Sequence, residues 1–158
     1  RLQTIGSTGE IQSDEVGVVR LTVKKAPGAD DIDLENATVQ WVGEQGTYNL
    51  VNASVDSSGA DGHFGILAFK DPDDSHPVLN DPDDRMVMVF DIGGNDTKAD
   101  NAFDGGRDNV NDQGADYFGN RLGEGDSVQV KITTKSGATT TERLVVPETL
   151  SGSSAVTL

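Results

Sequence analysis

The sequence of 158 residues contains no cysteine, so neither a disulfide framework nor a thiol-based site can form. Histidine is almost as scarce, because the chain has only His63 and His76, too few for a multi-histidine metal site. The apolar stretch at 87–90 falls far below the roughly 18 residues of a membrane helix. No signal peptide is visible, and since the chain opens with Arg1 rather than Met we expect a processed product or a fragment.

Positively charged residues are also scarce. Twelve Lys and Arg residues stand against 27 Asp and Glu, for a formal net charge of -15. This balance excludes nucleic acid as a partner, because neutralising phosphates needs clustered cations. Asp outnumbers Glu by 20 to 7, and self-repulsion is largely screened at ~1 M salt, where the Debye length is about 3 Å. The composition therefore favours a halophilic protein over an acidic mesophilic one kept soluble by its charge.

Apolar residues make up only 34% of the chain, but they alternate with polar ones in short segments. Alternation with period two predicts half-buried β-strands, while the 19 glycines and the absence of a long helical stripe argue against helices. Residues 86–90 are apolar on both faces, which predicts a central strand. The strands are expected at 18–24, 38–42, 46–51, 64–70, 86–90, 128–134 and 139–146. Such a series predicts one all-β sandwich or barrel domain over residues 1–158.

The acidic residues are concentrated in the middle of the chain. Residues 71–126 hold 15 acidic and 4 basic residues, whereas residues 127–158 hold 2 and 3. The middle is therefore expected to form long acidic loops. A nearly neutral C-terminal hairpin beside them is the part expected to meet neighbouring molecules.

Three N-glycosylation sequons begin at Asn36, Asn52 and Asn95, each in or next to an expected loop. Three is a mild excess over chance. In an extracellular setting these asparagines are the candidate glycan acceptors, and the alternative is that none is modified.

A regular acidic series supplies the candidate metal ligands. Asp100, Asp104, Asp108, Asp112 and Asp116 recur at every fourth position in a glycine-rich stretch, and residues 71–74 and 81–84 repeat the sequence DPDD. Carboxylates concentrated in such a loop can chelate Ca²⁺ or Mg²⁺. No segment completes an EF-hand, because the nearest one, from Asp56, has Leu67 where the bidentate Glu belongs. A solvated acidic loop is the favoured interpretation and a specific cation site the alternative.

Catalysis is not indicated. The sequence lacks a nucleophile elbow, a phosphate-binding loop and a dinucleotide fingerprint opening a helix. We therefore predict no enzymatic activity and no cofactor. Trp41 is expected in the core rather than on a ligand platform.

Several segments, taken in order, resemble haloarchaeal archaellins, the archaeal flagellins. They are APGADDIDL at 26–34, ATVQWVG at 37–43, LGEGD at 122–126, VPETL at 146–150 and the ending AVTL. The opening at Arg1 resembles the point where the long N-terminal helix of the family gives way to its β domain. The resemblance covers both ends of the chain well and residues 52–120 poorly.

The resemblance implies an immunoglobulin-like antiparallel β-sandwich with long acidic loops, on the extracellular surface of the archaellum filament. It implies a structural role in motility or surface adhesion, with N-linked glycans and other archaellin subunits as partners. Those subunits would be met through neighbouring β domains and through the N-terminal filament-core helix, which we expect to be absent from this chain. Ca²⁺ or Mg²⁺ is a further candidate partner, whereas nucleic acid and, for this fragment, membrane are not expected.

The alternative is an acidic cell-surface adhesin or carbohydrate-binding sandwich, in one version calcium-dependent. That function favours aromatic side chains aligned for sugar stacking, and the expected strands do not align Trp41, Tyr48, Phe64 or Tyr117. A secreted hydrolase is the weakest interpretation.

Overall fold

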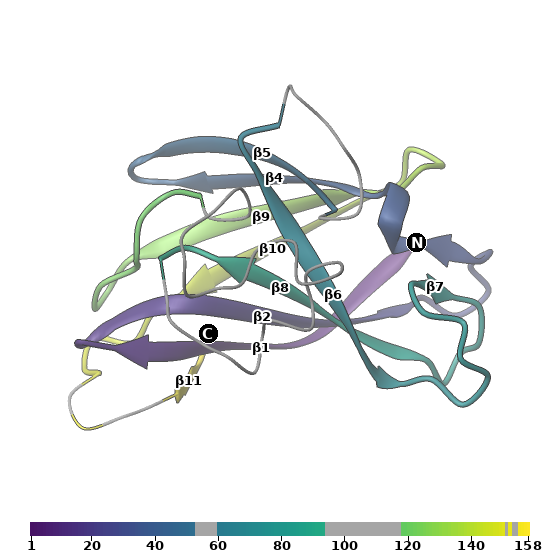
Figure 1. The fold of residues 1–158 in the computed structure, drawn as a ribbon, viewed down its shortest axis with the longest axis horizontal. Helices are drawn as coiled ribbons and strands as arrows, with labels where there is room; N and C mark the ends of the chain where they lie inside the picture. Colours follow the sequence, from purple (N-terminus) through teal and green to yellow (C-terminus); the bar gives the residue numbers. More distant parts are fainter. Residues whose placement is uncertain (53–59, 94–117, 151, 153–154) are drawn as a thin grey trace.

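The structure is a computed structural model that describes residues 1–52, 60–93, 118–150, 152 and 155–158 (Figure 1). Its elements are β-strands and one short 3-10 helix. In chain order they are β1 (Leu2–Gln12), β2 (Glu15–Lys25), β3 (Ile32–Asp33), η1 (Leu34–Asn36), β4 (Thr38–Gly43), β5 (Gly46–Asn52), β6 (Gly62–Lys70), β7 (Val78–Leu79), β8 (Arg85–Asp91), β9 (Ser127–Thr133), β10 (Thr139–Val145) and β11 (Ala155–Thr157). Among the described residues, no helix has the length and apolarity needed to span a membrane.

Nine of these strands form one large sheet in the order β10-β9-β4-β5-β6-β8-β2-β1-β11, and β3 pairs with β7 in a second, small sheet. Neighbouring strands of the large sheet run antiparallel except β5 and β6, which are parallel. The sheet curls, so that the start of β10 reaches the start of β1, where the Thr140 hydroxyl donates to the Leu2 carbonyl at 2.9 Å. Figure 1 shows β6 and β8 crossing over β9 and β10.

The two halves of the curled sheet enclose one hydrophobic core. Its members come from both halves, including Leu21 on β2, Trp41 on β4 and Ile132 on β9. The predicted all-β sandwich of mainly antiparallel strands is thereby confirmed. Its two layers belong to a single continuous sheet, because β5 and β6 carry the hydrogen-bond ladder from one layer to the other.

The alternation seen in the sequence decides which side chains enter the core. On β9, Val128, Val130 and Ile132 are buried while the residues between them are exposed or half-buried, as period two requires. All seven expected strands are present, as β2, β4, β5, β6, β8, β9 and β10. The central position of β8 is also confirmed, since β8 lies between β6 and β2.

Aromatic side chains fill the middle of the core. The Trp41 ring lies 5.3 Å from the ring of Phe90 and 5.3 Å from that of Phe118, measured between centroids. Trp41 is therefore a core residue, as expected, and Phe64 is likewise buried. Tyr48 is only partly buried and packs against the core, whereas Tyr117 lies outside the described residues. The described aromatics thus form no exposed sugar-stacking row.

Candidate functional site

The two DPDD motifs each form a turn in the connection between β6 and β8, and the two turns share one type of backbone hydrogen bond. In the first turn the Asp74 amide donates to the Asp71 carbonyl at 3.3 Å, and in the second the Asp84 amide donates to the Asp81 carbonyl at 3.0 Å. Proline suits the second position of such a turn, because its ring fixes φ near the required value. Between the turns, β7 pairs with β3 and anchors the connection to the rest of the chain.

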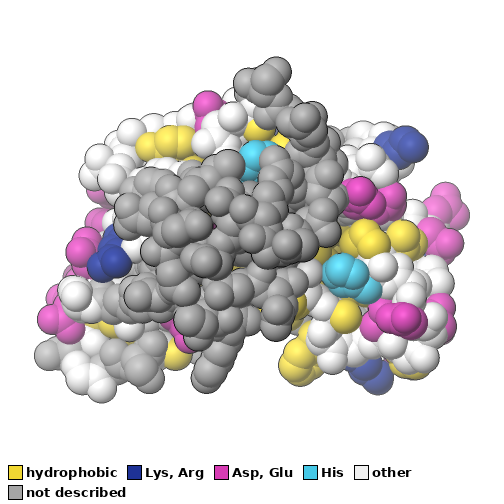
Figure 2. All heavy atoms as spheres, in the orientation of Figure 1, with side chains coloured by type: hydrophobic (Ala, Val, Ile, Leu, Met, Phe, Trp, Pro, Cys, Tyr) yellow, Lys and Arg dark blue, Asp and Glu magenta, His cyan; other side chains and the backbone are white. Residues whose placement is uncertain are grey.

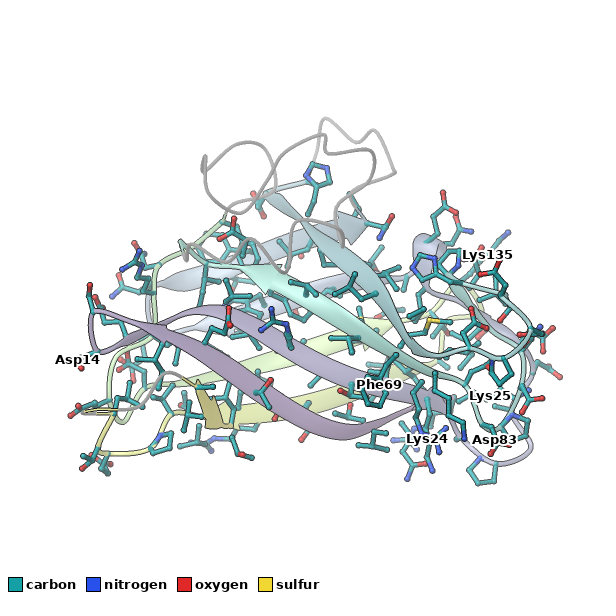
Figure 3. The ribbon with its side chains drawn as sticks, turned by 60° about the horizontal axis from the view of Figure 1, so that its bottom comes forward. Asp14, Lys24, Lys25, Phe69, Asp83 and Lys135 are labelled. Atoms are coloured by element: carbon teal, nitrogen blue, oxygen red, sulfur yellow. The ribbon has the colours of Figure 1, made fainter. Side chains whose placement is uncertain are left out.

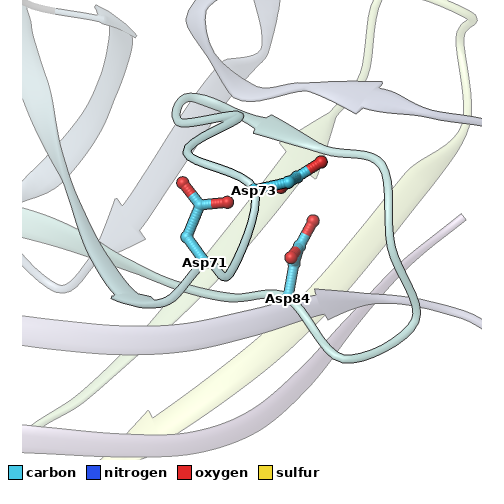
Figure 4. Close-up of side chains that lie close together, drawn as sticks. All are labelled: Asp71, Asp73 and Asp84. Atoms are coloured by element: carbon cyan, nitrogen blue, oxygen red, sulfur yellow. The ribbon is translucent and has the colours of Figure 1, made fainter.

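The turns bring three carboxylates together (Figure 4). One oxygen from each of Asp71, Asp73 and Asp84 lies within 4.8 Å of the other two. Oxygens on opposite sides of a Ca²⁺ ion, each about 2.4 Å from it, would be about 4.8 Å apart. The spacing therefore suits a divalent cation bound between the two turns.

Asp84 is the buried member of this carboxylate cluster. Its side chain is fully buried, and Oδ2 accepts from the amides of Asn80 at 3.1 Å and Asp81 at 2.9 Å. Its Oδ1 is buried and has no hydrogen-bond partner among the described residues, and the same is true of the Asn80 Oδ1. Leaving a buried acceptor unpartnered costs about 1–3 kcal/mol, more for a charged group. A bound cation would remove that cost.

Asp71 is held in place by backbone donors. Its carboxylate accepts from the amide of Ser75 at 2.9 Å and from the amide of His76 at 2.8 Å. Desolvation raises the pKa of Asp71, but the hydrogen bonds from Ser75 and His76 outweigh it, and the pKa is lowered from its ordinary value of 3.8. The Asp71 side chain is therefore ionised and ready to bind a cation at neutral pH.

Asp83 of the second DPDD turn lies at the same end of the molecule as Lys24 and Lys25 (Figure 3). The Lys25 ammonium donates to the Asn80 carbonyl at 3.0 Å and lies 3.7 Å from Asp31, so it ties the second turn to β2. Figure 2 shows acidic side chains gathered at the two ends of the visible face. The cluster offers three carboxylates, which are ligands that hard cations prefer.

The predicted metal ligands Asp100, Asp104, Asp108, Asp112 and Asp116 lie outside the described residues. The structure instead brings together carboxylates from the duplicated motif. The repeat was visible in the sequence, but which of its six aspartates converge depends on the pairing of β7 with β3.

The sequon asparagines occupy different environments. Asn36 ends η1 and is exposed, and its side-chain amide donates to Asp33 Oδ2 at 2.6 Å. Asn52 is buried at the end of β5, where its amide donates to the Phe64 carbonyl at 3.3 Å. Asn95 lies outside the described residues.

Comparison with known proteins assigns the family. The sequence model of the archaeal-type flagellins matches residues 1–149, nearly the whole chain. The chain belongs to the archaeal-type flagellin family. This confirms the resemblance to archaellins, and it makes the chain a structural subunit of the archaellum filament.

Similar proteins agree with this assignment. Flagellin A2 of Halobacterium salinarum is 31% identical over 159 residues, covering 100% of this chain and 69% of the relative. The crystal structure of archaeal flagellin FlaB1 from Methanocaldococcus jannaschii has a TM-score of 0.68 at 15% identity, covering 99% of this chain and 94% of that one. The archaeal flagellum of Methanospirillum hungatei gives 0.53 at 15% identity, covering 94% and 66%. The two structures support the fold of this archaeal-type flagellin, and the halophilic relative agrees with its acidic composition.

Proposed function

We propose that residues 1–158 form one outer β domain of an archaellin, exposed to hypersaline medium on the surface of the filament. The observation that carries the proposal is the family match over residues 1–149. The surface chemistry supports it, because a net charge of -15 keeps a domain hydrated and soluble in concentrated salt. The domain would be extracellular, and neighbouring subunits would be its partners.

Within the filament, the outer domain forms the surface and contacts neighbouring subunits, and it has no catalytic role. We infer that assembly uses a helical filament core together with contacts between neighbouring β domains, as the archaellin resemblance implies. Motility depends on the intact filament, so the function of this domain is mechanical.

We propose that Asn36 is a better glycan acceptor than Asn52. The Asn36 side chain is exposed, so a transferase can reach it once the bond to Asp33 opens. Modifying Asn52 in the folded chain would require breaking its bond to the Phe64 carbonyl and exposing a buried side chain. A glycan at Asn52 would therefore have to be added before β5 forms, and Asn95 remains a proposed acceptor on its sequon alone.

A divalent cation is proposed at the carboxylate cluster of Asp71, Asp73 and Asp84. The support is the fully buried Asp84 carboxylate, whose Oδ1 has no partner among the described residues. The ion would fasten the two DPDD turns to each other, and so would stiffen the connection between β6 and β8 without taking part in a reaction.

Filaments sheared from the native organism test the proposal. Peptide mapping of the purified filaments should recover peptides spanning this chain as a main component, with added glycan mass on the peptide that contains Asn36. Absence of this chain from filaments that its own host assembles would contradict the filament role. An unmodified Asn36 would contradict only the glycosylation proposal.

A further inference from the structure

The nine-stranded sheet has two edges, and an edge strand presents unpaired N–H and C=O groups to which a strand of another chain can add. β10 forms one of these edges. Its Glu142 lies opposite the buried Val130 and on the same face as the buried Thr140, so the half-buried carboxylate is on the core side of the sheet. An inward-pointing charge on an edge strand hinders strand addition. The edge at β10 is therefore protected by its own side chain.

The other edge is formed by β1 and the short β11, and β1 is regular over only part of its length. The pairing of β1 with β2 shifts register between Thr4 and Gly6 and again between Glu10 and Ile11. Register shifts of this kind disrupt a ladder and twist the strand, which protects an edge. From Gly6 to Glu10 the register is continuous. This stretch is therefore the part of β1 that is suited to accept another strand.

β11 covers this regular stretch (Figure 1). Its residues 155–157 pair antiparallel with residues 8–10 of β1. The amide of Leu158 donates to the Ser7 carbonyl at 3.1 Å, and the Ser7 hydroxyl donates to the Leu158 carbonyl at 2.9 Å. Residues 7–10 therefore have β2 on one side and residues 155–158 on the other. We call residues 155–158 the clasp.

The clasp is held by few side-chain contacts. Val156 and Leu158 pack against the core, while Ala155 and Thr157 are exposed. Gly9 leaves room for Leu158, since a Cβ at this glycine would lie 3.3 Å from Leu158 Cδ1. Segments with few buried apolar contacts open at low free energy without unfolding the remaining structure. The clasp can therefore leave β1 while the rest of the sheet stays folded.

Net charge gives an uncovered edge little protection in concentrated salt. The chain carries a formal charge of -15, but at ~1 M salt the Debye length is about 3 Å, which is shorter than the roughly 4.8 Å between paired strands. Two chains can thus approach to the distance of strand pairing without strong repulsion. A physical cover over residues 7–10 is then needed to prevent strand addition.

We propose that the clasp is a conformational device that controls access to the edge of β1. When the clasp is closed, residues 155–158 occupy the position that an added strand would take, and the chain stays monomeric. When it opens, residues 7–10 present unpaired backbone groups and accept an extended strand of another chain, which starts aggregation. The device does not depend on the proposed filament function, because it follows from the sheet edge alone.

A disulfide can lock the clasp in place, since the chain has no cysteine of its own. Thr8 and Thr157 are exposed and lie directly opposite each other. Because the neighbouring Ser7–Leu158 pair is hydrogen-bonded, the two threonines form a non-hydrogen-bonded pair, with Cα atoms about 4.5 Å apart, a distance that a disulfide can span. Thr8→Cys with Thr157→Cys therefore gives a protein whose clasp is locked when oxidised and free when reduced.

Thr133→Cys with Thr139→Cys is the matched control. These two threonines are also directly opposite each other, on β9 and β10. They are likewise next to a hydrogen-bonded pair, in which the Thr134 amide donates to the Ala138 carbonyl at 2.9 Å. The control disulfide leaves the clasp free, so it reports what a cross-link by itself does to aggregation.

The first readout is light scattering in ~1 M NaCl, compared between the oxidised and the reduced form of each variant. We expect the clasp variant to aggregate about tenfold faster when reduced, and the control to change by less than about twofold. Hydrogen exchange measured peptide by peptide on the original chain should show the clasp exchanging about 100-fold faster than β8. Equal aggregation of the clasp variant in its two states, equal slowing by the control disulfide, or a clasp that exchanges no faster than β8 would each overturn the proposal.

Discussion

Removal of divalent cations at constant ionic strength should destabilise the chain through the carboxylate cluster. The perturbation is a chelator in molar NaCl, followed by changing Asp71, Asp73 and Asp84 together to Asn. Asparagine keeps an acceptor oxygen at each position and removes the negative charge. It therefore weakens cation binding without emptying the site of polar groups.

The expected magnitude follows from the three converging oxygens, which lie within 4.8 Å of one another. Extracellular calcium sites bind with Kd of about 10⁻⁴–10⁻³ M, so 10 mM Ca²⁺ at the tighter end is about 100 times Kd. Binding to the folded state alone then contributes about 2.7 kcal/mol to the free energy of unfolding. For a chain of this size that is a rise of about 5–10 °C in Tm.

The assay is Tm measured with Ca²⁺ and with chelator. The original chain should respond to Ca²⁺ and the triple Asn variant should not. A matched variant with Asp104, Asp108 and Asp112 changed to Asn should keep the response. The reasoning is refuted if the original chain ignores chelator, or if only the matched variant loses its response.

The remaining expectations also concern stability. Tm should rise with NaCl and level off near 1 M, where the Debye length is about 3 Å, and a Tm that stays flat from low to molar salt would refute the halophilic interpretation. Phe90→Ala should cost about 3–5 kcal/mol because Phe90 is fully buried against Trp41. Phe69→Ala should stay within about 0.5 kcal/mol, since Phe69 is 74% exposed (Figure 3), and urea unfolding of the two variants tests this difference. The pKa of Asp71 is lower in the folded chain than its ordinary 3.8. The stabilisation by this carboxylate is therefore present above about pH 4 and is lost as pH falls through the lower folded value. Asp71→Asn should lessen the acid destabilisation in a pH series of Tm, and an unchanged series would contradict this.

Period-two alternation made most of the fold predictable, because it records which side chains a half-buried strand must bury. β1 was not predicted, because its residues do not show this alternation. Its pairing with β2 shifts register between Thr4 and Gly6 and again between Glu10 and Ile11, so no simple alternation survives along it. The short β3, β7 and β11 have too few residues to show any period.

The candidate site was only partly visible in the sequence. The DPDD repeat was visible in the sequence only as a duplication. Because an aspartate is almost never fully buried without a partner, the burial of Asp84 could not be anticipated. It depends on β7 pairing with β3, which is a long-range contact. The burial of Asn52 likewise depends on the pairing of β5 with β6, which the sequon does not reveal.

A cryo-electron microscopy reconstruction of filaments from the native organism tests the central claim most directly. The account predicts the nine-stranded curled sheet on the outer wall of the filament, with Asn36 facing solvent. Filaments whose outer wall is built from a different protein, with no density that fits this sheet, would contradict it.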